Sequence, residues 1–101
     1  MKKYMFIFHV AEKIEMGGET GASVMKWYEE NGASMADSGN PFNPDSEALV
    51  KGGVVEKGSD TAAGYTIMNA ENLEAAIELA KSCPFSTLPG CSVKVYETMP
   101  M

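Results

Sequence analysis

The sequence has little of what metal and cofactor sites are made from. It contains one histidine, His9, and two cysteines among its 101 residues. One histidine excludes a multi-histidine metal or haem site within a single chain, and no histidine–cysteine cluster for zinc is present. The glycine-rich phosphate loop GxGxxG, the P-loop and the nucleophile motif GxSxG do not occur either. We therefore expect no metal and no cofactor.

The two cysteines, Cys83 and Cys91, flank one loop, and their spacing is not the CxxC pattern of redox or zinc sites. A disulfide between them is geometrically possible. In a reducing cytosol, however, two free and half-buried thiols are the expected state.

Positive charge is also scarce, with 8 basic against 14 acidic residues and a net charge of −6. Nucleic acids and anionic membrane surfaces favour basic patches, so we expect neither as a partner. No apolar run approaches the roughly 20 residues of a membrane span. The N-terminal apolar stretch ends early, at His9, and no small-residue cleavage site follows, which favours a first strand in a cytoplasmic protein over a signal peptide.

The clearest pattern in the sequence runs from residue 64 to residue 98 and predicts a strand, a helix, a loop and a strand. The strands are expected over 64–69 and 92–98, where β-branched and aromatic residues alternate with polar ones. Between them, apolar residues recur at helical spacing, with Asn72 as N-cap and Pro84 as the stop. The predicted buried stripe of this helix is Leu73, Ala76, Ile77 and Ala80.

The first strand, predicted over residues 3–9, is apolar on both faces. Tyr4, Phe6 and Phe8 lie on one face, and Met5, Ile7 and His9 on the other. Such a strand is central and covered on both sides. Because two helices can cover only one face of a small sheet, we expect the second face to pack against a second subunit in a homodimer.

The remaining segments predict a helix over 21–31, a short strand over 33–37, and a hairpin formed by 47–50 and 54–57. Two strand–helix units in about a hundred residues suggest one domain, residues 1–101, of the α+β class. The expected fold is a ferredoxin-like split β-α-β sandwich.

Two residues at strand exits are candidates for catalysis, His9 after the first strand and Asp37 after the second. A carboxylate that accepts a hydrogen bond from one imidazole nitrogen fixes the tautomer and makes the other nitrogen a base. The alternatives are an interface histidine for His9 and an Asx turn for Asp37.

Candidate ligand-binding residues come from three further segments. Trp27 lies on the predicted first helix, where a tryptophan is more often part of the core. The loop of residues 38–45 contains glycine, prolines and asparagines that end regular structure. The four candidates are Trp27, Asn40, Phe42 and Tyr65.

Three stretches, KYMFIF, GYTIMNAENLEAAIELAKSCPF and VKVYE, together with the loop ADSGNPF, resemble the YCII-related (DGPF-type) domain proteins. The DGPF tetrapeptide itself is absent. The resemblance covers most of the chain and implies a dimeric α/β-barrel of ferredoxin-like subunits. Most members of that family have no assigned activity, a few are similar to enzymes acting on small chlorinated aromatics, and a His–Asp pair is discussed as the family's site. His9 and Asp37 are the residues that match such a pair.

The leading hypothesis is therefore a metal-free small-molecule enzyme that uses His9 and Asp37 for acid–base chemistry on a small ring compound. The alternatives are a non-catalytic module that binds a small ligand in the same cleft, and a purely structural dimeric module.

Overall fold

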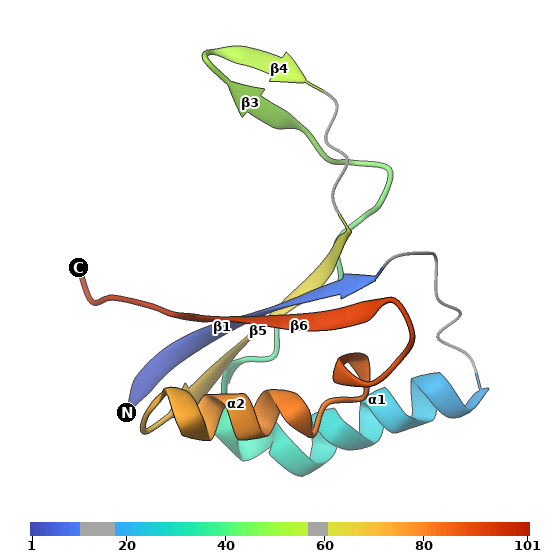
Figure 1. The fold of residues 1–101 in the computed structure, drawn as a ribbon, viewed down its shortest axis with the longest axis vertical. Coiled ribbons are helices and arrows are strands. Elements are labelled where there is room, and N and C mark those ends of the chain that lie inside the picture. The colour runs from blue at the N-terminus through green and yellow to red at the C-terminus, as the bar shows by residue number, and fades with distance from the viewer. Residues whose placement is uncertain (11–17, 57–60) are drawn as a thin grey trace.

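The main sheet has four strands, and two helices lie on one of its faces. A computed structural model describes residues 1–10, 18–56 and 61–101. Helices α1 (Gly18–Asn31) and α2 (Leu73–Lys81) lie below the sheet in the view of Figure 1. In chain order the strands of the sheet are β1 (Lys2–Val10), β2 (Met35–Asp37), β5 (Ala62–Ala70) and β6 (Cys91–Glu97).

The strand order across this sheet is β2-β5-β1-β6, and each neighbouring pair is antiparallel. The predicted α+β class is therefore confirmed, and the order is compatible with a ferredoxin-like fold. Strand β1 is central, as its two apolar faces predicted, with β5 on one side and β6 on the other.

Shorter elements fill the connections. The predicted hairpin forms from β3 (Leu49–Lys51) and β4 (Val54–Glu56), which make up a separate two-stranded sheet among the described residues. Two short 3₁₀ turns, η1 (Gly32–Ser34) and η2 (Pro84–Ser86), follow the two helices. Helix α1 is longer than predicted, since it already includes Gly18, and η1 takes up the start of the strand predicted over 33–37.

The core lies between the sheet and the two helices. Tyr4 and Phe6 of β1 are fully buried there, and Phe8 is 3% exposed. The Phe8 ring meets the Trp27 ring edge-on at 6.4 Å and the Phe85 ring at 5.3 Å. These contacts join β1, α1 and η2, so the aromatic residues hold both helical segments against the central strand.

Helix α2 packs through a different stripe from the predicted one. Asn72 is the N-cap, as predicted, and its side-chain oxygen accepts a 2.9 Å hydrogen bond from the Ala75 amide. Ala76 and Ala80 are buried, but Leu73 is 45% exposed and Ile77 37% exposed. The helix therefore faces the sheet with its small alanine side chains, which let it lie close to the strands. In this orientation the larger side chains of Leu73 and Ile77 lie at the rim of the contact. The prediction that Leu73 and Ile77 are core residues was therefore wrong.

Candidate functional site

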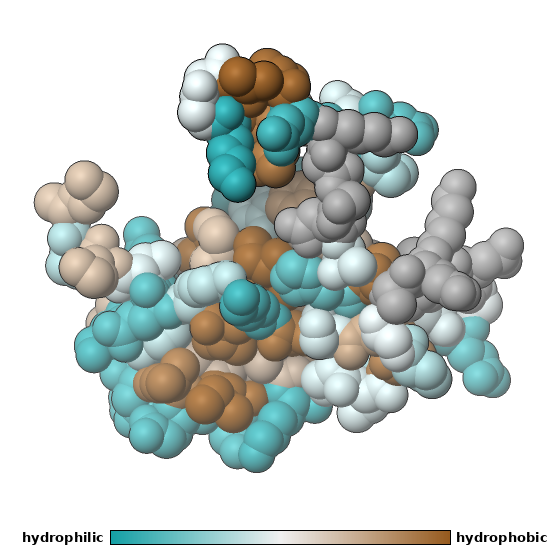
Figure 2. All heavy atoms as spheres, turned by 45° about the horizontal axis from the view of Figure 1, so that its top comes forward, coloured by the Kyte–Doolittle hydropathy of each residue, from teal (hydrophilic) through white to brown (hydrophobic). Residues whose placement is uncertain are grey.

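The face of the sheet opposite the helices is open and carries the candidate site. Met5 and Ile7 lie on this face, and each is only half-buried because neither of the described helices, α1 and α2, covers it. Their cross-strand partners are Ile67 and Tyr65 on β5, and Tyr96 and Lys94 on β6. Figure 2 shows hydrophobic side chains gathered over the sheet below the β3–β4 hairpin. The open face is thus an apolar surface with a charged residue, Lys94, on its β6 side.

His9 lies at the end of β1 on this open face. It is opposite Ser92 of β6 and, across a register shift after Phe8, opposite Ala62 of β5. The imidazole Nδ1 lies 3.0 Å from the hydroxyl of Thr61, the residue immediately before β5. This contact fixes the orientation of the ring, whichever of the two atoms donates. His9 is half-buried, so its ring forms part of the surface at this end of the sheet.

Asp37 lies elsewhere on the sheet. It pairs with Ile67, which in turn pairs with Met5, so Asp37 is level with Met5 and not with His9. Two strand spacings of about 4.8 Å and four residues of about 3.3 Å put the Cα atoms of His9 and Asp37 about 16 Å apart.

The Asp37 carboxylate accepts a 2.8 Å hydrogen bond from the Gly39 amide, which is the Asx turn that the sequence left open. The structure therefore does not bring the predicted His9–Asp37 pair together. The reason is that β2 ends at Asp37, before it reaches the level of His9.

The segment after Asp37 brings three of the predicted ligand-binding residues together. It runs along the edge of β5, where the Tyr65 amide donates to the Asn40 carbonyl at 3.3 Å and the Phe42 amide donates to the Ala63 carbonyl at 2.8 Å. The rings of Phe42 and Tyr65 stack, with centroids 5.9 Å apart and planes at 22°. Since Tyr65 is opposite Ile7, two residues before His9, the stacked pair lies at the His9 end of the open face.

Gly39 makes this arrangement possible. Its φ is +74°, and a Cβ atom at this position would lie 1.8 Å from the carbonyl oxygen of Tyr65. A residue with a side chain would clash with the backbone of β5, so glycine is required for the segment to approach the strand so closely.

A buried hydroxyl network anchors the same segment to helix α1. The Thr66 hydroxyl donates to the Ser38 carbonyl at 3.0 Å, and the Tyr28 hydroxyl lies 2.8 Å from the Thr66 oxygen. Because Thr66 has one hydroxyl proton and uses it on Ser38, Tyr28 must be the donor to Thr66. Burial raises the pKa of the Tyr28 hydroxyl. The network ties the site segment to the core through fully buried Thr66.

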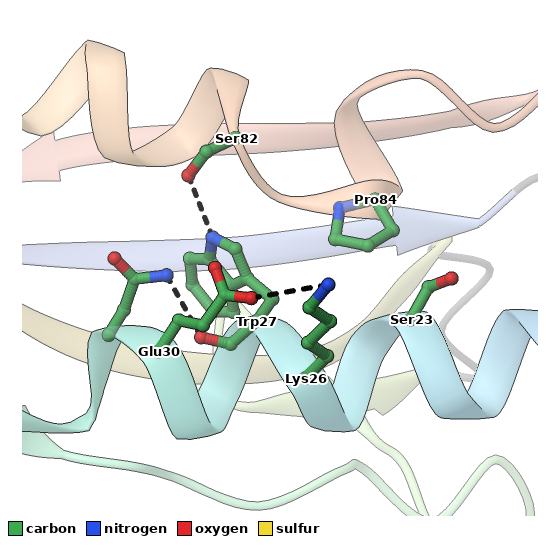
Figure 3. Close-up of a pocket in the computed structure, with 7 residues that line it drawn as sticks. Ser23, Lys26, Trp27, Glu30, Ser82 and Pro84 are labelled. Carbon is green, nitrogen blue, oxygen red and sulfur yellow. Dashed lines mark hydrogen bonds and ion pairs between the residues drawn. The ribbon is translucent and has the colours of Figure 1, made fainter.

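Trp27 is separated from the other predicted ligand-binding residues. It is 4% exposed in the core, and its indole N–H donates to the Ser82 hydroxyl at 2.9 Å. Its edge lines a shallow pocket of about 280 Å³ between α1 and the start of η2 (Figure 3). This pocket lies on the helix side of the sheet, and Lys26 and Glu30 form a 3.7 Å ion pair beside it. Its lining residues are Ser23, Lys26, Trp27, Glu30, Asn31, Ser82 and Pro84.

Two residues of the open face were missed by the sequence reasoning. Thr61, the contact of His9, belongs to a polar linker without any pattern. Lys94 holds its ammonium group 5.2 Å from the centre of the Tyr96 ring. Because side chains alternate along a strand, Lys94 and Tyr96 lie on the same face of the last strand. This alternation identifies Lys94 as a residue of the open face once Tyr96 is placed there.

Comparisons with known proteins give no family for this chain. A scan of family models, a search of curated proteins and a search of solved structures each found no match. Within the described ranges, no three histidine, cysteine or acidic residues gather in a way that could hold a metal ion. Across those same ranges, no helix is long and apolar enough to cross a membrane.

Proposed function

We propose that the chain is a ferredoxin-like domain, similar to the YCII-related proteins, that forms a homodimer by packing two open sheet faces together. The surface area supports this proposal. The chain exposes 7146 Å², whereas a monomer of its mass, 10.8 kDa, exposes about 5,500 Å². The excess of about 1,600 Å² per chain is what each subunit of an obligate dimer commonly buries.

The dimer is tested by sedimentation. Ile7→Lys places a charge in the middle of the open face and should abolish dimerisation, because an unpaired charge would be buried. Met25→Lys is the matched control, since Met25 is 61% exposed on α1, on the helix side of the sheet. A folded wild-type monomer at micromolar concentration would refute the dimer.

The proposed ligand is a small ring compound bound at the His9 end of the open face. The observation that carries this proposal is the stacked pair Phe42 and Tyr65, held there by Gly39 and the backbone of β5. Exposed aromatic faces bind planar rings by offset or edge-on stacking, at about 0.5–1.5 kcal/mol beyond the area buried. Phe42 is 42% exposed, so its ring offers surface to such a ligand.

His9 is the proposed acid–base group for a bound ring. A neutral imidazole has one nitrogen that can accept a proton and one that can donate its proton. The Thr61 hydroxyl at Nδ1 orients the imidazole at the edge of the apolar surface. Asp37 has no part in this proposal, since its carboxylate belongs to the turn at Gly39.

The experiment uses phenol and benzoate as probes and follows the ring signals of His9, Phe42 and Tyr65 by NMR. We expect saturable shifts at these three residues, weakened about tenfold in Phe42→Ala. Met25→Ala is the control and should leave binding unchanged. His9→Gln should weaken binding, because the imidazole at this end of the open face is lost. If neither probe shifts these signals up to millimolar concentration, the purely structural reading of the dimer replaces the ligand-binding one.

A further inference from the structure

The β3–β4 hairpin, residues 49–56, stands away from the rest of the chain as an arm. Figure 1 shows it on the side of the sheet opposite the helices. Gly52 and Gly53 have φ values of +59° and +77°, so the arm closes in a tight two-residue turn of the kind that suits a twisted hairpin. The arm is thus a built element and not an irregular loop.

The two faces of the arm differ in chemistry. Val50 pairs with Val55, and these two side chains form one face that is wholly apolar. They are 65% and 68% exposed, and Figure 2 shows hydrophobic side chains on the arm. The other face pairs Leu49 with Glu56 and Lys51 with Val54, so it carries both charges of the arm. Only the Val50–Val55 face has the composition of a buried contact.

The arm is left uncovered in the part of the chain that the structure describes. Every residue of β3 and β4 is exposed. An isolated two-stranded hairpin is at best marginally stable in water. The chain is also more extended than a compact domain, with a radius of gyration of 14.5 Å against about 13 Å for its length. Both observations indicate that the arm folds against something else.

We propose that the Val50–Val55 face of each arm packs on a second copy of this chain. The inference rests on the proposed dimer and adds a second contact to it. Because the arm stands on the open side of the sheet, pairing two open faces directs each arm toward the partner subunit. An isolated chain exposes about 1,600 Å² more surface than a monomer of this mass, which is enough for the dimer contact to include the arms as well as the open sheet.

The experiment measures the dimer dissociation constant by sedimentation equilibrium for the wild type and for Val50→Thr/Val55→Thr. Threonine keeps the shape and the strand preference of valine, so the arm should still form, but its face becomes polar. Four valine contacts are lost per dimer, and we expect the dissociation constant to rise about 100-fold or more. Val54→Thr is the control, because Val54 is 60% exposed on the other face of the same strand, and it should change the constant by less than about threefold.

Amide hydrogen exchange gives a second readout. The amides of Lys51 and Val54, the hydrogen-bonded pair next to the two-residue turn, should be protected at concentrations where the wild type is dimeric, and should lose this protection on dilution to the monomer. Protection that does not depend on concentration would overturn the proposal, because the arm would then be stable without a partner.

The outcomes separate the arm contact from the dimer itself. If the wild type is dimeric and the double variant dimerises equally well, or if Val54→Thr weakens the dimer as much, the Val50–Val55 contact is refuted and the dimer stands. If the wild type is monomeric, both fail. A monomer whose arm amides become protected only with neutral lipid vesicles would replace the partner subunit with a membrane surface.

Discussion

Gly39→Ala tests the geometry of the candidate site with one added methyl group. At φ +74° an alanine costs about 1–2 kcal/mol from conformation alone. The new Cβ would also lie 1.8 Å from the Tyr65 carbonyl oxygen, so the segment must move away from β5. That movement breaks three hydrogen bonds, namely Gly39 N–H to Asp37, Tyr65 N–H to Asn40 and Thr66 O–H to Ser38.

The expected loss of stability is the sum of these effects. Each hydrogen bond contributes about 0.5–1.5 kcal/mol net. With the conformational cost, the free energy of unfolding should fall by about 2.5–6.5 kcal/mol. Gly52→Ala is the control, since Gly52 has a similar φ of +59° but no atom within 4 Å of the added Cβ. It should cost only the conformational part, about 1–2 kcal/mol.

The assay is urea unfolding of both variants at the same protein concentration, because dimerisation makes the apparent stability depend on concentration. NMR contacts between the rings of Phe42 and Tyr65 should disappear in Gly39→Ala and remain in Gly52→Ala. Equal destabilisation of the two variants, or an intact ring contact in Gly39→Ala, would show that the segment does not lie against β5 as described.

Three further predictions concern the core and the thiols. Phe6→Ala should lower the free energy of unfolding by about 3–5 kcal/mol, and Ile77→Ala by only about 1 kcal/mol because Ile77 is 37% exposed; a larger loss for Ile77 in urea unfolding would restore the predicted helix stripe. Both cysteines are free, with Cys83 buried and Cys91 half-buried, so a thiol reagent should modify Cys91 in the folded protein and Cys83 only on unfolding. Burial raises the pKa of Cys83 from 9.0 to about 11. The contribution of the buried neutral thiol to the free energy of unfolding is therefore complete below about pH 9 and is lost as the pH rises to about 11. If Cys83→Ala loses stability at alkaline pH in the same way as the wild type, this assignment is refuted.

Local patterns in the sequence were enough for most of the elements. The two apolar faces of residues 3–9 predicted a central strand, and β1 is the strand flanked on both sides. Asn72 was identified as an N-cap because its side chain can reach a first-turn amide, a contact that depends on neighbouring residues alone. The hairpin followed from Gly52 and Gly53 between two apolar pairs.

The candidate site was predicted only in part, because it depends on register. His9 and Asp37 both end strands, but register shifts on β1 and β2 and the short length of β2 leave them at different levels of the sheet. The stacked pair of Phe42 and Tyr65 is formed because Gly39 lets a loop follow the edge of β5. Neither fact is visible in the period of a single segment.

The sequence by itself determined which segments are strands and helices and which faces of them are apolar, since a side chain's face follows from the period of its own element. Only the tertiary structure decided which residues of different elements meet. Helix α2 is rotated onto Ala76 and Ala80, and so Ile77 lies at the rim. The packing of the helix and the register of the strands are set by contacts between residues far apart in the chain, and those contacts leave no trace in local periodicity.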